Sequence, residues 1–152
     1  MVGRTVGARD GPGFRAAVRA SFANAALLAL LMTAAFALLG SPGVRLMTGL
    51  AEVRAQALAF LPYIVALPLV SVWAFVFDGI YFGATRTTEL RNGMVVALAL
   101  FLACAALLVP AFGNHGLWLT FLAFLAARAV VLALIYRRIE RTAPFVAAPI
   151  AV

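Results

Sequence analysis

The chain contains no lysine, a single cysteine and few charged residues, and each scarcity excludes a class of protein. Charged residues make up 11% of its 152 positions, whereas about 25% is usual in soluble domains. Hydrophobic residues make up 66%, and the mean hydropathy is +1.09. The lone Cys104 lies in an apolar run, which excludes a disulfide framework and predicts a packing role. The composition therefore indicates an integral membrane protein.

Motifs for catalysis and for nucleic-acid binding are also missing. All twelve basic residues are arginine, and with five acids they give a net charge of +7. They flank apolar runs and do not form a basic cluster with interleaved aromatics. The sequence has no nucleophile–base set, phosphate-binding loop or metal-ligand pattern, and we interpret its one histidine, His115, as a turn residue. We therefore expect no enzyme, no metal, no cofactor and no nucleic-acid partner.

Four apolar segments are long enough to cross a bilayer of about 30 Å, which takes about 20 helical residues. Their continuous apolar character favours helices over barrel strands, in which apolar and polar residues alternate. The predicted fold is all-α, a polytopic membrane protein with four transmembrane helices. These helices run over about 21–39, 57–84, 93–112 and 117–136, the first ending at the breaker cluster 40–43 and the last two joined through 113–116.

The arginines orient these spans. The helices lie within a transmembrane region, 21–138, which is flanked by an N-terminal segment, 1–20, and a tail, 139–152. Two arginines, Arg45 and Arg54, fall on the side opposite to the termini, and Arg128 falls inside the fourth segment. By the positive-inside rule, both termini are predicted to be cytoplasmic, in a cell inner (plasma) membrane. The nine arginines on the side of the termini are Arg4, Arg9, Arg15, Arg19, Arg86, Arg91, Arg137, Arg138 and Arg141.

Asp78 is an acid within a membrane-spanning segment, because residues 57–84 carry no other charge. A charged side chain at the centre of a membrane helix costs roughly 2.5–3.5 kcal/mol on insertion scales, so it normally faces a partner or a water-filled path. Ser71, Asp78, Tyr81 and Thr85 are spaced to share one helix face, which predicts a polar stripe lining protein or water. A functional role is favoured for Asp78. Placement at the headgroup level or at a helix bend, with Ser71 and Thr85 satisfying backbone carbonyls, is the structural alternative.

Arg128 is the second charge within a span. At 1.5 Å per residue it lies roughly 12 Å from Tyr136, and Asp78 lies roughly 10 Å from Thr85, so their predicted depths match. The two side chains could therefore pair, which would lower the cost of each. Extension of Arg128 towards the headgroups is an equally favoured alternative.

Three stretches resemble one family. The segment LPYIVALPLVSVWAFVFDGIYFGATRTTELRNGM (residues 61–94) is similar to the tenth-helix region of the MATE multidrug efflux transporters, in their DinF-like branch. The segment GNHGLWLTFLAFLAARAVVLALIYRR (113–138) resembles the twelfth helix, and VGRTVGARD (2–10) resembles the cytoplasmic end of the eighth. The resemblance implies a twelve-helix protein of two six-helix lobes, of which this chain matches the last four helices and the end of the eighth.

The resemblance also implies a function. It makes the chain the C-terminal part of a secondary active multidrug efflux transporter that exchanges drug for protons or sodium by alternating access. Asp78 would then correspond to the tenth-helix acid that binds the coupling cation, with Arg128, Ser71, Tyr81 and Thr85 as pairing or pore-lining residues. Expected partners are a cationic or amphipathic small molecule, the lipid bilayer and the missing first lobe, without which the chain is expected to be inactive. The alternative is a self-contained four-helix protein, acting as a homo-oligomeric small transporter or a structural subunit.

Overall fold

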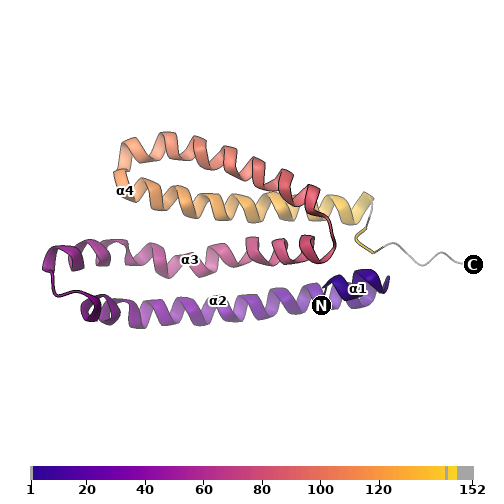
Figure 1. Cartoon of the computed structure of the whole chain (residues 1–152), viewed down its shortest axis with the longest axis horizontal. Coiled ribbons are helices and arrows are strands. Elements are labelled where there is room, and N and C mark those ends of the chain that lie inside the picture. Colours follow the sequence, from indigo (N-terminus) through magenta and orange to yellow (C-terminus); the bar gives the residue numbers. More distant parts are fainter. Residues whose placement is uncertain (1, 143, 147–152) are drawn as a thin grey trace, which may run out of the picture.

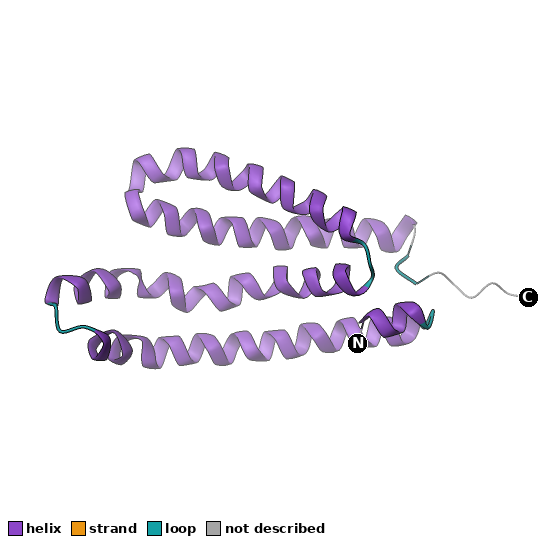
Figure 2. Cartoon of the chain, in the orientation of Figure 1, coloured by secondary structure: helices purple, strands orange, loops and turns teal. Residues whose placement is uncertain are grey.

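The computed structural model describes residues 2–142 and 144–146, and all regular structure in these residues is helical (Figure 2). The elements are α1 (Val2–Gly7), α2 (Gly11–Met47), α3 (Ala51–Gly83) and α4 (Thr87–Thr142). This confirms the predicted all-α class. Of the predicted tail, 139–152, residues 143 and 147–152 lie outside the described residues.

The helix α4 is folded back on itself at Gly113, so that its two halves run antiparallel (Figure 1). Gly113 has φ 57° and ψ −131°, a backbone conformation that side chains with a Cβ rarely adopt. By length and composition α2, α3 and α4 can each cross a membrane. Because the 56 residues of α4 are more than twice the length of one span, the chain has the four spans that the sequence predicted.

Two predicted interruptions are wrong. The first span does not end at the cluster 40–43, because α2 continues through Pro42 to Met47. The connection 113–116 is also shorter than predicted, because only Gly113 departs from helical geometry and His115 is helical. The physical reason is the same for both: lipid offers no partners to free backbone groups, so glycine and proline are tolerated within membrane helices.

The other helix ends follow local hydrogen bonding. The helix α2 begins ten residues before the predicted start, because the Asp10 side chain caps it and accepts a hydrogen bond of 2.9 Å from the Gly13 amide. The helix α3 begins earlier than predicted, at Ala51, and α4 extends past the predicted Tyr136 to Thr142.

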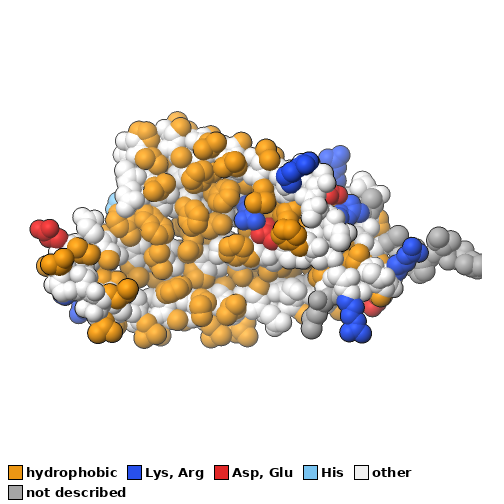
Figure 3. Space-filling view, in the orientation of Figure 1, with side chains coloured by type: hydrophobic (Ala, Val, Ile, Leu, Met, Phe, Trp, Pro, Cys, Tyr) orange, Lys and Arg blue, Asp and Glu red, His pale blue; other side chains and the backbone are white. Residues whose placement is uncertain are grey.

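The helices α2 and α3 and the second half of α4 lie side by side, with the first half of α4 outermost (Figure 1). The helix α3 contacts both α2 and α4, so Asp78 lies on the central helix. The buried core gathers at the end of the molecule that carries α1, which we call the termini end, and it includes Phe14, Tyr81 and Leu132. Elsewhere large apolar side chains cover much of the visible surface, as expected for helices in contact with lipid (Figure 3).

Candidate functional site

Asp78 and Arg128 form an ion pair between α3 and the second half of α4. The Nη2 atom of Arg128 lies 2.5 Å from Oδ2 of Asp78, and the two side chains are 13% and 15% exposed, respectively. In the space-filling view an acidic and a basic side chain adjoin within a largely apolar face (Figure 3). Of the two alternatives for Arg128, which the sequence left equally favoured, the structure shows the pair with Asp78.

The pair leaves one polar atom of each side chain without a partner. Oδ1 of Asp78 and Nε of Arg128 are both buried and have no hydrogen-bond partner among the described residues. A bidentate guanidinium–carboxylate contact would use two nitrogens and both oxygens. Because buried polar atoms are normally hydrogen-bonded, the site retains one acceptor and one donor for a further polar ligand.

The predicted polar stripe is only partly formed. Ser71 is buried in α3, and Tyr81 is fully buried, donating a hydrogen bond of 2.9 Å from its hydroxyl to the backbone oxygen of Leu132. Thr85 does not belong to this face, because α3 ends at Gly83 and Thr85 has a left-handed backbone with φ 58°. Its hydroxyl donates instead to the Ala84 carbonyl, at 2.7 Å.

The Tyr81–Leu132 hydrogen bond lies about one helical turn from the ion pair. Tyr81 follows Asp78 by three residues, and Leu132 follows Arg128 by four. Both steps lead along their helices towards the termini end (Figure 1). In this part of the α3–α4 contact the ion pair is therefore charged and partly accessible, whereas the neighbouring hydrogen bond is neutral and buried.

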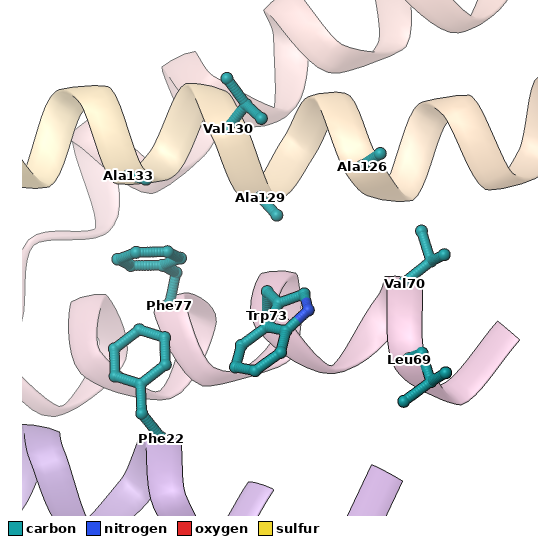
Figure 4. A pocket seen from close by; sticks show the side chains of 9 residues that line it. All are labelled: Phe22, Leu69, Val70, Trp73, Phe77, Ala126, Ala129, Val130 and Ala133. Carbon is teal, nitrogen blue, oxygen red and sulfur yellow. The ribbon is translucent and has the colours of Figure 1, made fainter. Parts of the chain in front are cut away.

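An apolar groove of about 500 Å³ lies between α2, α3 and the second half of α4 (Figure 4). Trp73 of α3 lies across the groove from Ala129 of α4 (Figure 4). Phe77 and Ala129, which directly precede Asp78 and follow Arg128, both line the groove, so it adjoins the contact that the ion pair makes. Its lining residues are Phe22, Leu69, Val70, Trp73, Phe77, Ala126, Ala129, Val130 and Ala133.

At the far end of the molecule, opposite the termini end, α3 and α4 make a further polar contact that the sequence did not reveal. The Tyr63 hydroxyl and His115 Nδ1 are 3.0 Å apart, and the rings of Phe60 and Trp118 pack around them. His115 therefore lies in the helix α4 and is hydrogen-bonded to Tyr63 of α3. Its interpretation as a turn residue is wrong. In the described part of the chain, no three His, Cys, Asp or Glu side chains come together in a way that could hold a metal ion.

At the termini end the sequence analysis missed Phe145, which follows α4. Its ring is 7% exposed and packs against Phe14, Tyr81 and Tyr136, with centroid distances of 5.5, 5.7 and 5.2 Å. The guanidinium of Arg86 lies over the same ring, 5.2 Å from its centroid. A single aromatic residue next to an Ala-Pro dipeptide carries no periodicity, so no sequence signal identified it.

Comparison with known proteins identifies a relative of this chain. It is 41% identical, over 146 residues, to DNA damage-inducible protein F of Escherichia coli strain K12, a member of the MATE family. The match covers 96% of the chain. Over nearly its whole length the chain therefore resembles the DinF-like branch of the MATE family. No family model matches it, and no solved structure matches it.

The chain spans about a third of the length of the curated relative, of which the match covers 32%. The resemblance predicted from residues 2–10, 61–94 and 113–138 is confirmed. With its apolar helices, the chain is a multi-pass membrane protein.

Proposed function

We propose that this chain forms the C-terminal part of a secondary active multidrug efflux transporter, in which Asp78 binds the coupling cation. The observation that carries the proposal is the Asp78–Arg128 pair, placed within two membrane-spanning helices and retaining an unpartnered carboxylate oxygen. Intramembrane carboxylates of this kind mark ion pathways in transporters. The 41% identity to a MATE-family protein supports the same assignment.

The mechanism that we propose is exchange of an amphipathic or cationic drug for protons or sodium by alternating access. The chain supplies four of the spans, with both termini in the cytoplasm and the inner membrane as the location. The remaining spans would come from the missing start of the second lobe and from the first lobe, which supplies the other wall of the path. The chain alone is therefore expected to be inactive.

A chimera tests this function. The chain replaces the matching third of the E. coli relative, and inverted vesicles are assayed for movement of a fluorescent cationic dye under an imposed proton or sodium gradient. The expected result is gradient-driven transport by the chimera and none by the chain alone. Transport by the chain alone would instead favour a self-contained oligomer.

Asp78→Asn in the chimera tests the coupling role, because it keeps the side-chain size and removes the charge. We expect coupled transport to be lost while the amount of protein in the membrane is unchanged. Glu52→Gln, the same chemical change at an exposed position in the first turn of α3, is the matched control and should retain transport. Full gradient-driven transport by Asp78→Asn would show that Asp78 has a structural role only.

A further inference from the structure

The Asp78 carboxylate, to which we assign the coupling cation, is already paired with a positively charged side chain. Arg128 contacts Asp78 directly, and both side chains are largely withdrawn from solvent. Asp78 has a single negative charge, so a bound cation together with Arg128 would leave an uncompensated positive charge in a membrane span. Such a charge is strongly unfavourable away from water. Cation binding to Asp78 therefore disfavours the Asp78–Arg128 contact, and that contact disfavours cation binding.

We propose that Arg128 is an internal competitor of the coupling cation: it neutralises Asp78 when the site is empty of cation, and the cation must displace it to bind. The inference rests on the proposed role of Asp78. Arg128 acts through Asp78 and is a positioning residue. It contacts Asp78 in the form without a cation and is released from Asp78 in the cation-loaded form.

The contact geometry suits displacement. The pair uses one nitrogen and one oxygen, and Oδ1 of Asp78 remains free to accept an incoming cation before the contact to Oδ2 is broken. The long apolar stem of arginine lets its guanidinium extend along the helix towards a wetter region once released. A bidentate contact would offer the cation no free oxygen.

Hydrogen bonds between α3 and α4 limit which part of the helix contact can change when Arg128 is displaced. The Tyr81–Leu132 hydrogen bond contains no charged group, so displacement of Arg128 leaves it intact. It holds α3 and α4 together at the termini end, and the Tyr63–His115 hydrogen bond joins them at the far end, while the contact between these two bonds loses its ion pair. Trp73 and Ala129 line the groove that adjoins this part of the contact. Cation binding should therefore change the surroundings of Trp73.

The two tryptophans of the chain allow a direct experiment. In a Trp118→Phe background, Trp73 fluorescence of the full chain in lipid nanodiscs is titrated with sodium chloride at constant pH, with choline chloride as the control. A second series lowers the pH in choline chloride. The variants are Arg128→Gln, which removes the competitor, Arg128→Lys, which keeps its charge, and Asp78→Asn, which removes the site. Circular dichroism confirms that each variant is helical.

The expected result is that Arg128→Gln responds at a cation concentration at least about tenfold lower than the parent, since close charge pairs are commonly coupled by that factor or more. Arg128→Lys should stay near the parent midpoint, and Asp78→Asn should not respond. A purely structural role for Arg128 predicts the opposite, weaker binding in Arg128→Gln. A midpoint in Arg128→Gln equal to or above that of the parent, or no response in either, overturns the inference. A response retained by Asp78→Asn would instead contradict the proposed function.

Discussion

The hydroxyl of Tyr81 donates a hydrogen bond to the backbone oxygen of Leu132, 51 positions along the chain, at a distance of 2.9 Å. Both residues are fully buried, at 0% exposure. The bond joins α3 to the second half of α4 next to the Asp78–Arg128 pair. It is therefore a buried, uncharged hydrogen bond that stabilises the helix contact next to the candidate site.

Tyr81→Phe should destabilise the chain by about 1 kcal/mol, because interhelical hydrogen bonds in membrane proteins contribute about this much or slightly less. Unfolding in mixed micelles by an increasing fraction of sodium dodecyl sulfate, followed by circular dichroism, measures the change. Tyr63→Phe is the matched control, since its hydrogen bond to His115 is exposed and water can replace it. Equal losses in the two variants would contradict the importance of the buried bond.

Substitution of alanine for each of three glycines should change the stability of the chain by different amounts. A methyl group at Gly116 would collide with the backbone oxygen of Leu108 in the other half of α4, so Gly116→Ala should cost about 2–3 kcal/mol. At Gly93 the methyl group would lie 2.8 Å from the Cδ2 atom of Leu132, a flexible side-chain end that can move, and the cost should be nearer 1 kcal/mol.

Gly43 is the control for this series, because a methyl group there meets no other atom within 4 Å. Gly43→Ala should be neutral or stabilising by up to about 1 kcal/mol, as alanine favours the helix more than glycine does. The same unfolding assay in micelles ranks the three variants. A Gly116→Ala variant as stable as Gly43→Ala would show that the halves of α4 are not closely packed at Leu108.

Much of the fold could be predicted because membrane helices are encoded locally. Four apolar runs of sufficient length predicted the four spans, and the uniform rise of a helix placed Asp78 and Arg128 at one depth. The matching membrane depths favoured neither an Asp78–Arg128 pair nor an Arg128 extended towards the headgroups. Depth alone does not determine which helix faces are in contact. The packing of α3 against α4 decided it.

The failures of prediction have separate physical causes. Pro42 reads as a helix breaker by rules drawn from water-soluble proteins, yet it lies inside α2 because lipid favours a continuous helix. Thr85 has the spacing of the polar stripe, but α3 ends two residues before it. Phe145 and the Tyr63–His115 contact depend on tertiary packing between distant segments, for which the sequence has no local signal.

Phe145→Ala should destabilise the termini end by about 3 kcal/mol, as expected for removing a buried phenylalanine ring. The loss should include the ring contacts to Phe14 and Tyr136. Phe112→Ala is the matched control, because Phe112 is 59% exposed and should cost less than about 0.5 kcal/mol in micelles. A loss at Phe145 as small as at Phe112 would show that the ring does not hold α2, α3 and α4 together.

The final prediction concerns the orientation of the spans in the membrane. Nine arginines on the side of the termini, against Arg45 and Arg54 on the other, predict that the α3–α4 connection lies in the cytoplasm. In a Cys104→Ala background, Thr88→Cys and Gly49→Cys provide exposed labelling sites beyond opposite ends of α3. A membrane-impermeant maleimide applied to intact cells should label only the cysteine at position 49, and the cysteine at position 88 should react only after permeabilisation. Labelling of position 88 in intact cells would reverse the orientation and place the termini outside.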